Sequence, residues 1–179
     1  MDVCINRSEK TIKWNVGSRV ITIYNEHILY AFKHGKNLLM VKEKYESSES
    51  GFTLYSQDGS IVLSYQYLGN RFTFGNINIA DIDGKIIAAD YEEEKRRIVI
   101  LKELEGTKSL FIYDEYGDFI TEIVPPKGYI FVSLKNNHGN IMVVGQGISE
   151  ITRDSFGRNY WSYAIDFENF YIQKKSIIQ

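Results

Sequence analysis

The sequence contains very little cysteine and proline, and each shortage excludes a class of protein. Cys4 is the only cysteine among 179 residues, so the chain cannot close the intramolecular disulfides of small secreted domains. The two prolines are adjacent (Pro125 and Pro126) and aromatic residues reach 14%, a balance that favours β-strands over disordered segments. No apolar run approaches the roughly 18–20 residues of a membrane-spanning helix. The first residues lack the apolar core of a secretory signal, so we expect a cytoplasmic protein without membrane contact.

Residues that carry chemistry in enzymes are equally sparse. His27, His34 and His138 fall in or beside expected turns, and their spacing does not match a zinc site, which needs three or four convergent ligands. The sequence has no nucleophile elbow of the G-x-S-x-G type. The formal charge of −2 provides no basic field for nucleic acid. We therefore predict no catalytic centre, no metal, no cofactor and no direct nucleic-acid partner.

Short alternations of apolar and polar residues, separated by Gly, Asn and Asp, recur along almost the whole chain. This pattern is typical of antiparallel strands joined by tight turns. Residues 91–104 are the best candidate for a helix, but a strand, a charged turn and a second strand explain them better. The sequence therefore predicts an all-β antiparallel meander in a single domain over residues 1–179.

The pattern also repeats, with a period of roughly 55–58 residues. Residues 52–59 (FTLYSQDG) reappear as residues 110–117 (LFIYDEYG). Residues 77–87 (INIADIDGKII) reappear as residues 132–142 (VSLKNNHGNIM). We predict three repeats, preceded by an extra strand at residues 11–16. The expected repeats span approximately residues 18–69, 70–126 and 127–176.

Units of this kind, each with a Tyr-x-x-x-Gly hairpin near its end, resemble the blades of a β-propeller. The resemblance covers residues 18–176 and implies a ring of blades, of which propellers typically use four to eight. Three units are too few for one chain, so self-association is one way to close the ring. A β-trefoil, which is also built from three repeats, or another β-barrel is the alternative.

Acidic residues concentrate around two expected turns, one after the strand at residues 85–91 and one after the strand at residues 110–113. Alternate turns of an antiparallel meander lie at the same end of the sheet, so the two turns should share one rim. We interpret this rim as a partner-binding surface; the alternative is that the charges only solvate the turns. The predicted partner-binding residues are Asp90, Glu92, Glu93, Glu94, Asp114, Glu115, Asp118 and, as an aromatic anchor, Tyr116.

Aromatic residues form a second candidate site near the end of the chain. Trp161 and Tyr163 lie two residues apart in an expected strand and share one face, while Tyr160 takes the other. Core packing accounts for one of these faces. An exposed pair would offer a large contact area to a sugar or another small ligand. Trp161 and Tyr163 are therefore the alternative ligand-binding residues.

In size, charge placement and lack of catalytic residues, the chain resembles the small bacterial immunity proteins, which neutralise a cognate toxin by covering its active site. The resemblance implies a protein partner such as a basic nuclease toxin domain, attracted by an acidic surface. Two other functions stay open. One is a carbohydrate or small-ligand binding domain, and the other is a hydrolase whose carboxylates converge from several loops.

Overall fold

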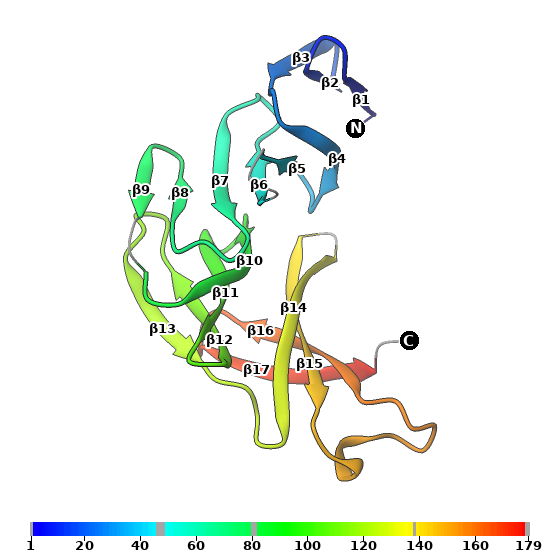
Figure 1. Ribbon diagram of the computed structural model, residues 1–179, viewed down its shortest axis with the longest axis vertical. Helices are drawn as coiled ribbons and strands as arrows, with labels where there is room; N and C mark the ends of the chain where they lie inside the picture. Colours follow the sequence, from blue (N-terminus) through cyan, green and yellow to red (C-terminus); the bar gives the residue numbers. More distant parts are fainter. Residues whose placement is uncertain (1, 46–48, 80–81, 138, 178–179) are drawn as a thin grey trace. The chain divides into compact units, whose positions relative to one another are not determined.

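Most of the described residues belong to antiparallel β-sheets. The computed structural model describes residues 2–45, 49–79, 82–137 and 139–177, and these residues form four sheets from strands β1 to β17 (Figure 1). The sheets are open, and neighbouring strands follow one another in the chain. The predicted all-β antiparallel meander is therefore confirmed. The described residues contain one short helix, a 3-10 turn at Glu150–Thr152.

The contacts within the chain define two compact units, Met1–Asp81 (unit 1) and Ile82–Gln179 (unit 2). The described part of unit 1 contains a three-stranded and a six-stranded sheet. The first sheet comprises β1 (Val3–Asn6), β2 (Thr11–Val16) and β3 (Arg19–Tyr24). The second comprises β4 (Ile28–His34), β5 (Leu38–Lys44), β6 (Ser50–Tyr55), β7 (Ile61–Gln66), β8 (Phe72–Phe74) and β9 (Ile77–Ile79).

The two sheets of unit 1 share a hydrophobic core around Trp14, whose side chain is 1% exposed. Ile12 lies two residues before Trp14 on β2, so both side chains project from the same face of the strand. The indole N–H of Trp14 donates a hydrogen bond of 3.0 Å to the carbonyl oxygen of Gln57, which satisfies the polar group that the ring brings inside. The other buried members of this core are Leu39, Val41 and Tyr55.

The described part of unit 2 contains two four-stranded sheets. Its core lies between them, and residues of β11 and β12 such as Leu101 and Leu110 meet residues of β14 and β15 such as Phe131 and Val143 there. The first sheet comprises β10 (Lys85–Glu92), β11 (Arg97–Leu104), β12 (Thr107–Tyr113) and β13 (Phe119–Ile123). The second comprises β14 (Tyr129–Asn137), β15 (Asn140–Gly147), β16 (Tyr160–Asp166) and β17 (Tyr171–Ile177).

One of the two sequence repeats places the same type of turn at two points of the chain. The turns at residues 56–60 and 114–118 close their hairpins with the same pair of backbone hydrogen bonds, 2.9 and 3.1 Å long in the first turn and 3.0 and 3.2 Å in the second. Each turn requires a glycine, because Gly59 and Gly117 have φ values of 89° and 84°. The similarity at a shift of 58 residues therefore reflects shared turn chemistry.

The other sequence repeat does not correspond to a shared structure. Residues 77–79 form β9 at the edge of the six-stranded sheet of unit 1, whereas residues 132–137 lie in the β14–β15 hairpin of unit 2. One of the two expected repeat boundaries also differs from the sheet boundaries. The expected boundary after residue 69 falls inside the six-stranded sheet, because β8 pairs with β7. A similar run of residues can thus end one sheet in one place and form a hairpin in another.

Candidate functional site

Two ion pairs connect three turns of unit 2. Arg96 of the first turn pairs with Glu115 of the second. Lys95 of the first turn pairs with Glu168 of the third, its Nζ lying 2.7 Å from the carboxylate Oε1. We call the three turns together the acidic rim. They are the β10–β11 turn (residues 93–96), the β12–β13 turn (residues 114–118) and the β16–β17 turn (residues 167–170).

Aspartates hold two of these turns in shape. Asp114 Oδ1 accepts hydrogen bonds of 2.9 Å from the backbone N–H groups of Tyr116 and Asp118. Asp166 Oδ1 accepts bonds of 2.9 Å from the N–H groups of Glu168 and Asn169. The Asn169 N–H is the largest of several contacts that lower the pKa of the Asp166 carboxyl. Both aspartates therefore have a structural role that fixes the rim.

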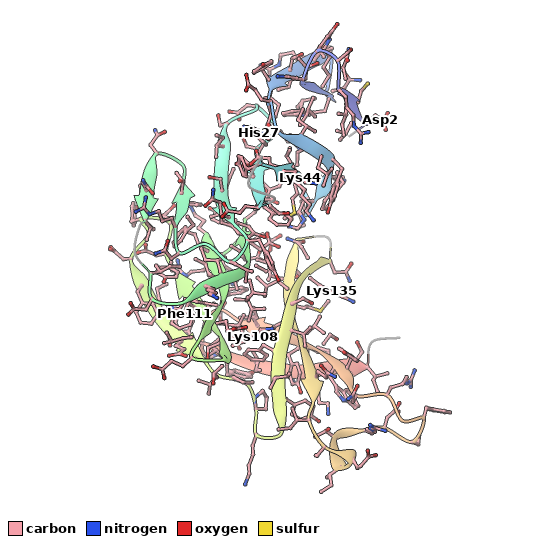
Figure 2. All side chains as sticks on the ribbon, viewed as in Figure 1. Asp2, His27, Lys44, Lys108, Phe111 and Lys135 are labelled. Carbon is pink, nitrogen blue, oxygen red and sulfur yellow. The ribbon has the colours of Figure 1, made fainter. Side chains whose placement is uncertain are left out.

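The groups that the β12–β13 turn presents to solvent are an aromatic ring and a carboxylate. The Tyr116 side chain is 67% exposed, and Asp118 is exposed as well. Phe119, the first residue of β13, is 56% exposed and contacts the ring of Phe111, which Figure 2 labels on β12, at 6.1 Å between centroids. This part of the rim offers apolar contact area next to negative charge.

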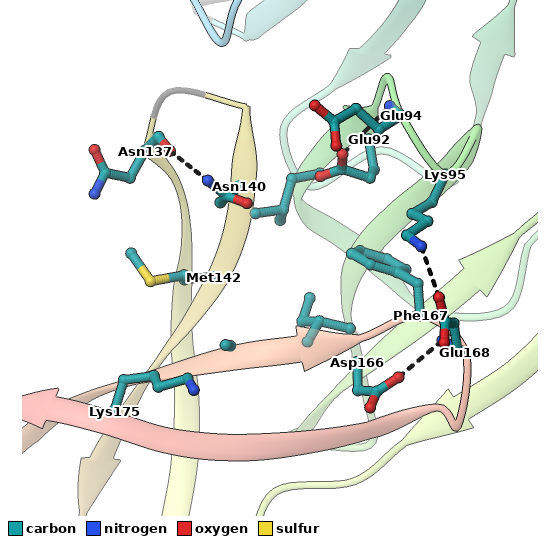
Figure 3. A pocket seen from close by; sticks show the side chains of 13 residues that line it. Glu92, Glu94, Lys95, Asn137, Asn140, Met142, Asp166, Phe167, Glu168 and Lys175 are labelled. Carbon is teal, nitrogen blue, oxygen red and sulfur yellow. Dashed lines mark hydrogen bonds and ion pairs between the residues drawn. The ribbon is translucent and has the colours of Figure 1, made fainter.

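A pocket of about 630 Å³ opens beside the rim (Figure 3). Its walls are partly apolar, with Met142 of β15 and Phe167 of the third turn among them. Lys95 and Lys175 also line the pocket, and Lys95 points to Glu168 in Figure 3. The lining includes four carboxylates, those of Glu92, Glu94, Asp166 and Glu168. The pocket thus combines an apolar wall with an excess of negative charge.

The Glu92 carboxylate is the most deeply placed acid of this pocket, with only 6% of the residue exposed. Burial raises the pKa of the Glu92 carboxyl above its ordinary value. Hydrogen bonds from the backbone N–H groups of Glu94 and Ile141 act in the opposite direction, and the negative charges of Glu94 and Asp90 raise the pKa further. In the absence of a cation, the protein therefore disfavours the charged form of the Glu92 carboxyl.

The structure places the predicted partner-binding residues in different environments. Asp90 is 2% exposed and Glu92 is 6% exposed, so neither lies on the outer surface of the rim, although Glu92 lines the pocket. Asp90 accepts a hydrogen bond of 3.2 Å from Asn136 Nδ2. Glu93 and Glu94 also interact with other groups of the protein. Of the predicted set, Glu94, Tyr116 and Asp118 are exposed, whereas Glu93, Asp114 and Glu115 are half-buried.

The alternative ligand-binding pair is occupied by contacts within unit 2. Tyr163 is 3% exposed and belongs to the hydrophobic core, and its burial, together with neighbouring Tyr129, raises its pKa to about 12. Trp161 is half-buried, and Lys174 Nζ lies 3.4 Å from the centre of its ring. The Trp161 indole N–H donates a bond of 3.2 Å to the carbonyl oxygen of Thr152. The Tyr163 ring is therefore buried, and Lys174 lies over the Trp161 ring.

Two acids of the pocket, Asp166 and Glu168, were missed by the sequence analysis. The signal that could have found them is the run Asp166-Phe-Glu-Asn169, in which an aspartate can bind the N–H groups two and three residues ahead. The position of this turn beside the β10–β11 turn is a property of the tertiary structure, because 73 residues separate Lys95 from Glu168.

The two histidines that the structure describes, His27 and His34, form no shared metal site with each other. The His27 ring, labelled in Figure 2, lies 4.7 Å from the ring of Tyr45, and His138 is outside the described residues. In the described part of the chain, no group of three or more His, Cys, Asp or Glu side chains is arranged to hold a metal ion. The same residues include no helix with the length and apolarity needed to cross a membrane.

Comparison of the sequence with models of known protein families gives no match, and comparison with curated proteins gives no significant match.

Proposed function

We propose that this chain is a non-catalytic protein-binding module and that its acidic rim binds a basic protein. The observation that carries the proposal is the construction of the rim, in which two ion pairs and two turn-holding aspartates fix the three turns next to a partly apolar pocket. A prearranged surface of this kind binds with little loss of side-chain freedom.

The pocket supports a basic partner because of its chemistry. A lysine or arginine side chain has a long apolar stem and a charged head. The stem would lie along Met142 and Phe167, and the head would approach the carboxylates at the inner end of the pocket, among them Glu92. The positive charge would then favour the ionised form of a carboxylate that burial now disfavours.

Tyr116 and Asp118 support a protein partner rather than a small ligand. An exposed tyrosine gives large contact area at low entropic cost, and such residues are often central to protein interfaces. Asp118 supplies a charge that would accelerate the approach of a basic protein. Both residues lie on a turn whose backbone Asp114 holds in place.

Among protein-binding functions, we propose that of a bacterial immunity protein, which covers the active site of a toxin such as a nuclease. The absence of a catalytic motif from the sequence and the acidic rim support this choice. The four-stranded meanders β10–β13 and β14–β17 have the strand number of propeller blades. We therefore include in the proposal a propeller-like scaffold, in which repeated hairpins present the turns to the partner.

The proposal is tested by capturing partners of the tagged protein from its native host, with the products of neighbouring genes expressed, and assaying the captured partner with and without the chain. A stoichiometric complex with a basic protein whose activity the chain suppresses is the expected result. A chain that stays monomeric in this experiment, or one whose partner retains full activity in the complex, would contradict the proposal.

A further inference from the structure

A second pocket, of about 290 Å³, lies on one face of the six-stranded sheet of unit 1. Thr53 on β6, Ser64 on β7 and Thr73 on β8 are directly opposite one another in the strand register. Their hydroxyl groups therefore form a row across three strands on one face of the sheet. The pocket is also lined by Glu43, Tyr55 and Gln66.

The Glu43 carboxylate is built into this pocket. The residue is 6% exposed, and its Oε1 accepts hydrogen bonds of 2.5 Å from Asn25 Nδ2 and 3.2 Å from Thr53 Oγ1. Its Oε2 accepts a bond of 2.7 Å from the Tyr45 hydroxyl. Burying a carboxylate is costly unless such donors surround it. Three donors therefore hold the Glu43 carboxylate at a fixed point of the pocket.

Glycine at position 51 makes this arrangement sterically feasible. A Cβ atom there would lie 2.7 Å from Tyr45 Cε2 and 2.9 Å from Glu43 Oε2, both closer than side chains tolerate. Gly51 does not have a positive φ, so its backbone does not require glycine. The requirement for glycine comes from the side chains that form the pocket.

Three other polar side chains line the pocket without a hydrogen-bond partner among the described residues. Among the described residues, the side chains of Ser64, Gln66 and Thr73 make no hydrogen bond. Ser64 and Thr73 are half-buried, so their hydroxyl groups lose part of their hydration without gaining a protein partner. These groups point to an incoming molecule that both donates and accepts hydrogen bonds.

We propose that this pocket binds a small, neutral, polyhydroxylated molecule of monosaccharide size. A ligand hydroxyl can donate to one group and accept from the next, which suits a row of hydroxyls next to a carboxylate and an amide. The lining contains one acid, Glu43, and one base, Arg71, so it has no excess charge that would select an ion. The volume lies at the lower limit of roughly 300–1,000 Å³ for ligand pockets, which suits one small molecule.

This inference does not depend on the proposed function, because the pocket belongs to unit 1 and the acidic rim to unit 2. Ligand binding by the pocket and partner binding by the rim can therefore be confirmed or contradicted separately.

The test is a titration of isotope-labelled protein, followed by amide NMR, with D-glucose, N-acetyl-D-glucosamine, glycerol and myo-inositol as probes. Inorganic phosphate and glycine serve as charged probes. The expected result is saturable binding of at least one neutral probe in the millimolar range, with shifts concentrated in β6, β7 and β8.

The variant S64A with T73V removes two hydroxyls of the row and should weaken that binding about tenfold, because two hydrogen bonds are lost. T22V is the matched control, because Thr22 is exposed on β3 and does not line the pocket. The amide spectrum of each free variant reports whether it is folded, and S64A or T73V alone replaces the double variant if that one is not. No saturable binding of a neutral probe, binding of phosphate or glycine alone, or unchanged binding by the folded hydroxyl variant would each overturn the proposal.

Discussion

The guanidinium of Arg96 pairs with the carboxylate of Glu115, so that the β10–β11 turn and the β12–β13 turn are connected at one end of their sheet. The Arg96 side chain is 65% exposed, whereas that of Glu115 is only 20% exposed. The pair therefore masks part of the negative charge of the rim. Because the guanidinium is in contact with water, we expect the pair to contribute little to folding, as solvated ion pairs are worth roughly 0–1 kcal/mol.

Replacing Arg96 separates these two effects. We expect Arg96→Gln to change the free energy of unfolding by less than about 1 kcal/mol, as measured by urea denaturation. The same variant should bind a basic partner with a faster association rate, because a positive charge has left the rim. Arg153→Gln is the matched control, since Arg153 forms another exposed pair in unit 2, with Glu150. Slower association of R96Q than of R153Q would be inconsistent with an attractive acidic rim.

Two acids of the β12–β13 turn should differ in role, with Asp114 holding the turn and Asp118 available for binding. Asp114→Ala removes two hydrogen bonds to backbone N–H groups and should lower the free energy of unfolding by about 1–2 kcal/mol. Asp114→Asn retains an acceptor and should be milder. Asp118→Ala should be within about 0.5 kcal/mol of wild type, because its side chain is exposed. Equal losses of stability for D114A and D118A would show that the turn is not held as described.

Glu92 should make stability depend on pH in a specific direction. Its pKa is raised in the folded state by burial, so folding favours its protonated form. The stability that protonation provides is present below the ordinary value of 4.5 and is lost as the pH rises through the raised folded value. We expect Glu92→Gln to remove this loss, so that its stability relative to wild type increases from pH 4 to pH 7.

Thermal unfolding of wild type and E92Q across this pH range measures the difference directly, because other carboxyl groups contribute equally to both proteins. A difference that stays constant with pH, or that decreases toward pH 7, would contradict a raised pKa for Glu92.

Gly51→Ala should destabilise unit 1 although it adds only one methyl group. The added Cβ would collide with Tyr45 and Glu43, and such overpacking typically costs about 1–3 kcal/mol. Tyr45→Ala removes the nearest atoms, so the cost of Gly51→Ala should decrease in that background. Chemical denaturation of the two single variants and the double variant gives this coupling. If the two changes have additive effects on the free energy of unfolding, the destabilisation by Gly51→Ala does not come from the contact with Tyr45.

The strands and turns were predictable from the sequence because their signals are local. Alternating apolar residues and a charged turn predicted a hairpin over residues 91–104, and the structure has β10 and β11 joined there. The turn expected after the strand at residues 110–113 is present at residues 114–118. Both features depend on residues that are close in sequence, so they do not require knowledge of the packing.

The candidate site was only partly predictable, because burial and long-range contacts decide it. Glu92 belongs to an acidic run but is buried, whereas Asp118 has the same charge and is exposed. Glu168 joins the rim through Lys95, and no sequence spacing indicates this contact. Tyr163 was a candidate ligand-binding residue, yet it lies in the hydrophobic core. The strand alternation predicted that Trp161 and Tyr163 share one face of their strand. It could not show whether the core would cover that face.

The most direct measurement is the association rate of the captured basic partner, determined over a series of salt concentrations for wild type and two charge reversals. Asp118→Lys changes the rim, and Glu105→Lys makes the same change in the exposed β11–β12 turn of the same sheet. If the acidic rim binds the partner, D118K should slow association about tenfold at low salt and flatten its salt dependence, while E105K should stay close to wild type. Equal rates and equal salt dependence for the two variants would contradict binding at the rim.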